Sequence, residues 1–165
     1  MTTNGDTLTA SLNYQLTSEG NYKMHEYHIY MGADHRGFEK KEALFELIKD
    51  CHENVIVEDL GYEEYNEGDD FNDPAKAVAK AVSGDEHSFG VLMCGSGQGV
   101  CIQANRIKGA RAVRVKTPED AVSGREHDWA NIVCMPADEL SVEEMEKIVK
   151  AFCHAKILDD ERHQR

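Results

Sequence analysis

Features that define several common protein classes are scarce in this chain of 165 residues. Its five cysteines form an odd set without a C-x-x-C pair, which argues against a disulfide framework and against a zinc ribbon. Basic residues are few, with 18 Lys and Arg against 31 Asp and Glu. A net charge of −13 leaves no basic footprint, so we expect neither nucleic acid nor membrane as a partner.

Long apolar runs are also missing. None approaches the ~20 residues of a membrane span. Residues 1–23 lack the cationic leader and the apolar block of a secretory signal. With unpaired cysteines, these absences predict a cytoplasmic protein in a reducing setting.

The chain length predicts one domain with its own core. Residues 1–24 are rich in Thr, Ser, Asn and Gly, and we expect a flexible N-terminal extension with at most one marginal strand. Residues 25–165 are expected to form the single domain.

From Tyr27 on, β-rich segments alternate with helical ones. The expected strands are Tyr27–Ala33, Asn54–Leu60, Phe89–Met93, Ala112–Val115 and Asn131–Met135. The expected helices are Phe38–Asp50, Pro74–Val82, Gly99–Ile107, one that Pro118 begins after a Thr117 cap, and Ser141–Ile157 with a capping box from Ser141 to Glu144. This alternation predicts an α/β fold: a three-layer, Rossmann-like, five-stranded and mostly parallel sheet with helices on both faces. Ligands bind such sheets at the carboxyl ends of the strands.

A glycine-rich turn follows the third expected strand, over residues 94–99. A strand, a glycine turn and a helix start direct backbone N–H groups at one spot, which stabilises an anion or a reaction oxyanion. The Walker A lysine is absent, and no acidic residue ends the next strand. The turn therefore matches neither the Walker A motif nor the dinucleotide-binding motif. Tight turns also use glycine for backbone reasons alone, which leaves the turn's function open at this point.

The thiol and the hydroxyl beside this turn belong to Cys94 and Ser96. Cys94 is either a small buried hydrophobe or, at a helix N-terminus, a usable base or nucleophile. The other cysteines fall within elements and are expected to be packing residues: Cys51, Cys101, Cys134 and Cys153. In the acidic loop 61–73, Asp69 and Asp70 are expected to be solvated rather than to bind a metal.

Five segments together resemble a known family. They are Gly32–Phe38, Cys94–Gly99, Ala104–Ala112, Arg125–His127 and Arg162–Arg165. In order and spacing they resemble the B-type ribose-5-phosphate isomerases and the related galactose-6-phosphate isomerase subunits. The resemblance runs from about Tyr27 to the end of the chain.

The resemblance implies an aldose–ketose isomerase that acts through a cis-enediolate, without a metal or a cofactor. By this resemblance Cys94 is the base that moves a proton between C1 and C2. The backbone N–H groups of Gly95, Gly97 and Gly99, with the Ser96 hydroxyl, would hold the enediolate oxygen.

The remaining roles are also carried over from the family. His127 matches its ring-opening histidine, and Asp34 matches a carboxylate that contacts the sugar hydroxyls. His35 and Arg162 match phosphate contacts. The family builds its site between two subunits, which implies a homodimer or a dimer of dimers in which His127 and Arg162 face the partner's cysteine loop.

Three positions depart from the family pattern, all near the presumed phosphate pocket. Asp128 stands where the family has Asn after the ring-opening histidine, and we count it among the substrate-binding residues. Asp138 stands where an arginine is common, and the chain stops at Arg165, one position short of another arginine. An unpaired carboxylate would repel a phosphate by about 1 kcal/mol at water-like dielectric. Alternatively, both acids point to solvent and a nearby cation grips the phosphate, with Arg36, Arg114, Lys116 and Arg165 as candidates.

The sequence therefore predicts an isomerase of ribose 5-phosphate and ribulose 5-phosphate. One alternative keeps the chemistry and changes the substrate to galactose 6-phosphate or a tetrose phosphate. Another is a non-catalytic sugar-phosphate binder, although a binder has no need for a base. Thiol redox chemistry at Cys94 is a weaker alternative, because no resolving cysteine lies nearby in the sequence.

Overall fold

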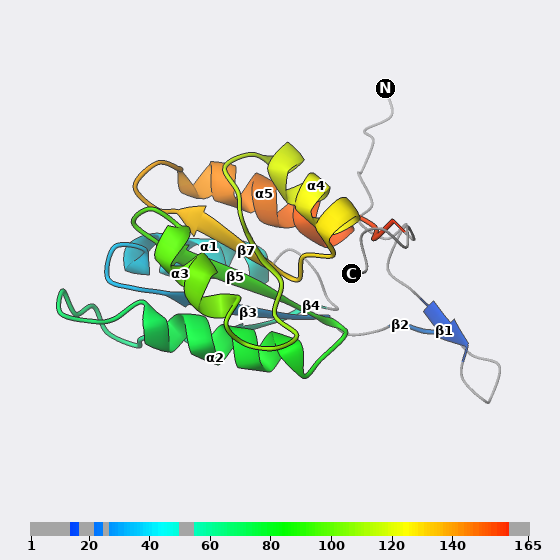
Figure 1. The fold of residues 1–165 in the computed structure, drawn as a ribbon. Coiled ribbons are helices and arrows are strands. Elements are labelled where there is room, and N and C mark those ends of the chain that lie inside the picture. The colour runs from blue at the N-terminus through cyan, green and yellow to red at the C-terminus, as the bar shows by residue number, and fades with distance from the viewer. Residues whose placement is uncertain (1–13, 17–21, 25–26, 50–54, 159–165) are drawn as a thin grey trace, which may run out of the picture.

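A central parallel sheet organises the protein, as the computed structural model shows (Figure 1). The structure describes residues 14–16, 22–24, 27–49 and 55–158. The strands are β1 (Tyr14–Leu16), β2 (Tyr22–Met24), β3 (Tyr27–Ala33), β4 (Val55–Asp59), β5 (Ser88–Cys94), β6 (Ala112–Arg114) and β7 (Ile132–Pro136). The helices are α1 (Phe38–Lys49), α2 (Asn72–Ser83), α3 (Gln98–Ala104), α4 (Pro118–Asp128) and α5 (Val142–His154).

The strand order reverses within the sheet. The order is β4-β3-β5-β7-β6, and each neighbouring pair is parallel. The chain leaves β3 toward β4 on one side and then returns to β5 on the other side. The order therefore reverses between β3 and β5, and in open α/β sheets this switch point is where ligands bind.

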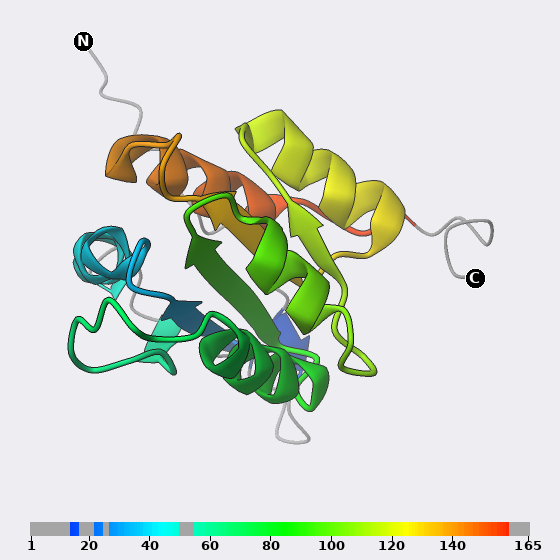
Figure 2. The same cartoon turned by 60° about the vertical axis from the view of Figure 1, so that its left-hand side comes forward.

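Side chains of the central strands alternate between two apolar cores. Val91 and Met93 of β5 pack with α1, α4 and α5, whereas Leu92 and Cys94 pack with α2 and α3. Figure 2 shows these two helix layers on opposite sides of the sheet. All seven residues of β5 are buried, as expected for a strand covered on both faces. The predicted three-layer α/β fold with a five-stranded sheet is confirmed.

Two helix starts match the sequence signals for them. Thr117 accepts a hydrogen bond from the Asp120 N–H, and the Asp120 carboxylate reciprocates at the Thr117 backbone. Ser141 and Glu144 form the same capping box at α5. Such boxes satisfy N–H groups that a helix start leaves unpaired.

Several element bounds differ from the sequence prediction. Helix α2 begins at Asn72, so that Pro74 lies inside its first turn. Helix α5 ends at His154, because Ala155 is extended and the Leu158 N–H donates to the Glu126 carbonyl on α4 at 3.0 Å. The last described residues thus run beside the end of α4.

The N-terminal segment contains two strands, more than the single marginal strand that was expected. β1 and β2 pair antiparallel, with Leu16 opposite Tyr22. Each has three residues, too few for a period-two pattern to stand out in the sequence. The division into an extension and one domain stays a prediction. Among the helices that the structure describes, none has the length and apolarity needed to cross a bilayer.

Candidate active site

The loops after β3 and β5 meet at the switch point. The Asp34 N–H donates to the Met93 carbonyl at 3.3 Å, which joins the end of β3 to the end of β5. Asp34, His35 and Arg36 therefore lie beside the turn that Cys94 begins. The sheet order brings together two of the segments that the sequence analysis singled out.

The thiol lies inside the turn. Cys94 is the last residue of β5 and is 5% exposed. Its Sγ accepts a hydrogen bond from the Gly97 N–H, with an N···S distance of 3.2 Å. The Ser96 Oγ accepts from the Gln98 N–H at 3.2 Å. The predicted thiol, hydroxyl and backbone N–H groups thus occupy one spot.

Gly97 is required by the shape of this turn. Its φ of 71° lies in the left-handed region, where residues with a Cβ are strained. A Cβ at this position would also lie 2.9 Å from the backbone carbon of Met135 and the nitrogen of Pro136 on β7. A side chain here would push the turn away from β7 and move the N–H from the Cys94 thiol.

The other two glycines of the turn lie against side chains from neighbouring loops. A Cβ on Gly95 would meet the Arg36 guanidinium carbon at 2.6 Å, so that the guanidinium packs directly on the Gly95 backbone. A Cβ on Gly99, in the first turn of α3, would meet the Phe71 ring at 2.9 Å. Arg36 and Phe71 therefore pack against the turn at its two outer glycines.

Asp34 is a buried carboxyl at the end of β3. It is 6% exposed, and its Oδ1 accepts from the N–H groups of Arg36 at 3.0 Å and Gly37 at 3.2 Å. Burial raises the pKa of Asp34 above its ordinary value, an effect that these two N–H groups and His35 oppose and that the Asp69 carboxylate increases. Asp34 therefore keeps its proton to a higher pH than a free aspartic acid.

We expect Asp34→Asn to raise the midpoint of thermal unfolding at neutral pH by roughly 2–4 °C, the shift that about 1 kcal/mol produces in a domain of this size. Asparagine keeps an oxygen for both N–H groups but removes the buried charge. The raised pKa means that ionised Asp34 costs stability, and this cost develops as the pH rises from the unfolded value through the folded one. Paired unfolding curves between about pH 3 and pH 8 test this. An Asn variant less stable than the wild type at neutral pH would contradict it.

His35 is held by an acid from the loop between β4 and α2. The His35 N–H donates to the Asp69 Oδ1 at 3.0 Å, and the His35 Nδ1 lies 2.9 Å from the same oxygen. The Asp69 side chain is 1% exposed. The prediction that Asp69 is a solvated loop residue is wrong, because the loop folds back over the end of β3. In the described part of the chain, no group of three or more His, Cys, Asp or Glu side chains is arranged to hold a metal ion.

Asp138 is paired rather than isolated. Its carboxylate forms an ion pair with Arg36, and its N–H donates to the Gly95 carbonyl at 3.1 Å. The unpaired carboxylate that the sequence analysis considered at this position is therefore not found. Next to this pair, the Arg114 Nε donates to the Ser96 carbonyl at 2.7 Å and its NH2 group to Glu139 at 2.9 Å. Two arginines and two acids thus frame the glycine turn.

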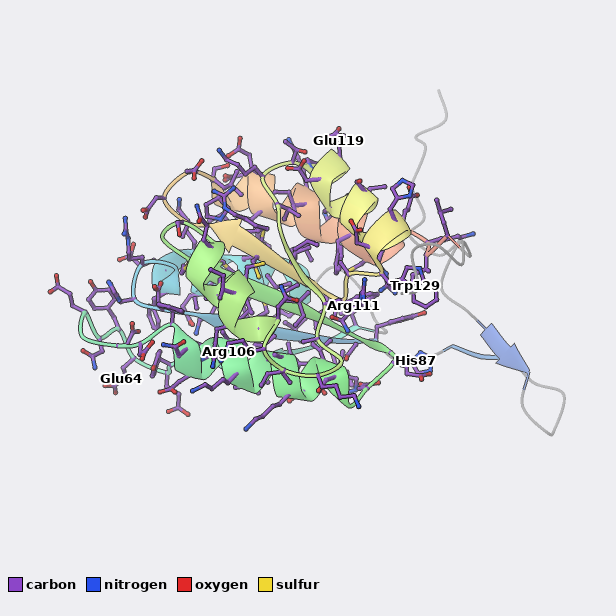
Figure 3. The ribbon with its side chains drawn as sticks, viewed as in Figure 1. Glu64, His87, Arg106, Arg111, Glu119 and Trp129 are labelled. Carbon is purple, nitrogen blue, oxygen red and sulfur yellow. The ribbon has the colours of Figure 1, made fainter. Side chains whose placement is uncertain are left out.

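His127 and Asp128 lie at the opposite end of the sheet. Helix α4 begins after β6 and runs back, so its last turn is near the amino ends of the strands. Figure 3 shows the labelled Arg111 and Trp129 toward the same end of the sheet as His87, which directly precedes β5. The Arg111 Nε donates to the Asp128 carbonyl at 2.6 Å. A hollow of about 260 Å³ lies here, lined by Asn105, Ala110, Arg111, Ala112, Val113 and Asp128.

One chain therefore assembles only part of the predicted site. Cys94, Ser96, Asp34 and His35 come together, whereas His127 does not reach them within the same chain. Arg162 lies outside the described residues.

One relationship among the thiols does not show in the sequence. The Cys101 Sγ on α3 donates to the Ala112 carbonyl at 3.4 Å; interaction with Cys134 on β7 lowers the pKa of Cys101, and burial raises the pKa of Cys134. Burial also raises the pKa of Cys153 to about 12. Cys134 has no exposed surface and belongs to the core, as predicted, and Cys51 lies outside the described residues.

The fold and the site together define an open α/β protein with a thiol-bearing glycine turn at its switch point. A family model described as Ribose/Galactose Isomerase matches residues 29–165. The chain belongs to this isomerase family.

Relatives with assigned names agree with this placement. The probable ribose-5-phosphate isomerase B of Mycoplasma genitalium is 36% identical over 140 residues, which cover 84% of this chain and 90% of that protein. The D-erythrulose-4-phosphate isomerase of Pectobacterium atrosepticum is 27% identical over 128 residues, 78% of this chain and 83% of that protein.

Solved structures are similar as well. The Mycoplasma genitalium ribose-5-phosphate isomerase B with bound ribulose-5-phosphate superposes with a TM-score of 0.76 and is 34% identical, covering 86% of this chain and 91% of that chain. The type B ribose 5-phosphate isomerase of Trypanosoma cruzi gives a TM-score of 0.78 at 34% identity, over 84% and 90% of the two chains.

Proposed function

We propose that this protein interconverts ribose 5-phosphate and ribulose 5-phosphate. Family membership and the named relatives support the reaction class. The observation that carries the proposal is the Cys94 thiol at the switch point, 3.2 Å from the Gly97 nitrogen, at the end of a strand whose Met93 carbonyl accepts from the Asp34 N–H. A base next to preorganised N–H donors is what an enediolate reaction needs.

In the proposed reaction, Cys94 acts as a thiolate on the open-chain aldose. It takes the proton from C2, the electron pair of that bond forms the C1–C2 double bond, and the carbonyl oxygen on C1 takes up the charge. N–H groups of Gly95, Gly97 and Gly99 and the Ser96 hydroxyl stabilise this enediolate. Proton transfer from O2 to O1 and protonation of C1 by the Cys94 thiol, after its proton has exchanged with solvent, give the ketose, so the step requires no cofactor.

In this proposal, residues of the loops around the turn bind the sugar and the phosphate of the substrate. Asp34 contacts hydroxyls near the reacting carbons, and His35 contacts the phosphate. Arg36 and Arg114 supply local positive charge beside the turn, although each also pairs with an acid. Arg162 is retained as a further phosphate contact.

A second copy of the chain completes the site in this proposal. His127, which opens the sugar ring, and Asp128 lie at the amino end of the sheet, away from the Cys94 turn of the same chain. The chain also passes beside His127 at the Leu158–Glu126 hydrogen bond, so the tail that carries Arg162 leaves the described region there. We therefore infer a homodimer or a dimer of dimers.

The proposed setting is the cytoplasm, and the proposed ligand is a small sugar phosphate rather than nucleic acid or a membrane. The cysteines of the described residues are free thiols, which suits a reducing compartment. The chain's net charge of −13 supports the absence of polyanionic partners.

A tetrose phosphate is the second candidate substrate, because one relative is named D-erythrulose-4-phosphate isomerase. Values of kcat/KM for ribose 5-phosphate, a tetrose phosphate and galactose 6-phosphate separate these alternatives. We expect the highest value for ribose 5-phosphate. A higher value for the tetrose phosphate would move the assignment to it, and binding of all three without turnover would favour the sugar-phosphate binder.

A further inference from the structure

The Asp69 carboxylate contacts His35 through one oxygen. Its Oδ1 accepts from the His35 backbone N–H at 3.0 Å and lies 2.9 Å from the His35 Nδ1. The carboxylate is almost fully buried, at 1% exposure, whereas the His35 side chain is 26% exposed. A buried acid thus supports a histidine that is partly exposed at the end of β3.

The second oxygen of Asp69 makes this arrangement costly. Its Oδ2 is buried and has no hydrogen-bond partner among the described residues. Leaving a carboxylate oxygen buried and unsatisfied costs free energy, and such groups in native proteins call for an explanation. Apart from His35, the described residues offer the Asp69 carboxylate no hydrogen-bond partner, although its backbone N–H donates to the Asn66 carbonyl.

Contacts on both sides of Asp69 hold its loop in place. The Tyr62 hydroxyl donates to the Asp70 carbonyl at 3.0 Å, and the fully buried Lys41 donates to the Tyr62 carbonyl at 3.1 Å. Phe71 lies against Gly99 at the start of α3. The position of the Asp69 carboxylate is therefore set by the loop as well as by His35.

We propose that Asp69 is a positioning residue that fixes the tautomer and orientation of His35, so that the ring presents Nε2 to the substrate. The proton on Nδ1 is directed to Asp69, because the hydrogen bond that one ring nitrogen makes sets the state of the other. Tyr65 meets the ring edge-on at 6.5 Å, and Asp34 is the other acid beside it. The role of His35 toward phosphate rests on the proposed function, whereas its tautomer does not.

The tautomer is measured directly by ¹⁵N NMR of the imidazole nitrogens in the full chain, with His35→Ala identifying the signal. We expect the neutral ring of the wild type to carry its proton on Nδ1. Asp69→Ala should shift the population toward the Nε2–H form, and Asp69→Asn should retain the Nδ1–H form, because its amide oxygen still accepts. Glu67→Gln, in the same loop, is the matched control and should change nothing. An unaltered tautomer in Asp69→Ala would overturn the proposal.

A double-mutant cycle separates ring positioning from anchoring of the loop. Asp69→Ala should raise the KM for ribose 5-phosphate about tenfold with little change in kcat. Removing the hydrogen-bond partner that orients a metal-binding histidine costs a similar factor in metal affinity. In a His35→Ala background the same change should have no further effect, because the ring is gone. The backbone N–H of His35 remains there, so a further rise in KM would show loop anchoring and contradict the proposal. If the wild type isomerises no sugar phosphate, the proposed function fails, and the NMR result still decides the role of Asp69.

Discussion

Cys94→Ala should lower kcat for ribose 5-phosphate by about 10²–10⁴-fold, the usual contribution of a positioned general base. The KM should change much less, because the thiol is expected to act on a carbon-bound proton rather than to grip the phosphate. Steady-state kinetics over a range of substrate concentrations measures both parameters. The Gly97 N–H, which donates to the thiol at 3.2 Å, then loses its acceptor.

Two variants separate the chemistry from packing. Cys94→Ser keeps the size of the side chain and a hydrogen-bond acceptor, but a serine hydroxyl is a poor base, so it should be nearly as inactive as the alanine variant. Cys101→Ala removes a neighbouring thiol on α3 and should leave kcat within about twofold of the wild type, since it alters no reacting group. If Cys94→Ser retained wild-type kcat, the thiol would not be the base.

A mixture of two inactive variants should recover activity. In the proposed assembly each site takes Cys94 from one copy and His127 from the other. Co-expressed Cys94→Ala and His127→Ala chains form mixed dimers in about half of cases, each with one intact site, so about one quarter of wild-type activity should return under two-fold symmetry.

The matched control pairs two variants from the same edge of the sheet. Cys94 and Asp34 belong to one site of one chain, joined through the Asp34–Met93 hydrogen bond. Co-expressed Cys94→Ala and Asp34→Ala chains therefore leave no site intact in a mixed dimer and should recover nothing. Recovery in the control, or none in the Cys94 and His127 mixture, would contradict a site shared between copies.

Parts of the site next to the ends of strands followed from the sequence. Cys94, Ser96 and Asp34 come directly after or at the end of apolar β-rich segments, and parallel strands end at one edge of the sheet. Their positions near one another follow from where these strands end, whereas their chemical roles stay predictions. The α/β fold could also be predicted, because β-rich and helical segments alternate along the sequence.

Contacts between loops could not be predicted in this way. Asp69 lies 34 positions from His35, and Asp138 lies 102 positions from Arg36. Each pairing depends on the strand order and on how a loop folds over the edge, neither of which shows in a local pattern. The acidic composition of loop 61–73 instead favoured solvation, because most carboxylates in such loops are exposed.

The central claim is that Cys94 moves a proton on a sugar phosphate, and proton exchange tests it most directly. Ribose 5-phosphate incubated with the protein in D₂O and followed by NMR should give ribulose 5-phosphate with deuterium at C1, and Cys94→Ala should give neither product nor exchange at a comparable rate. No isomerisation by the wild type, or deuterium incorporation by Cys94→Ala at the wild-type rate, would contradict the account.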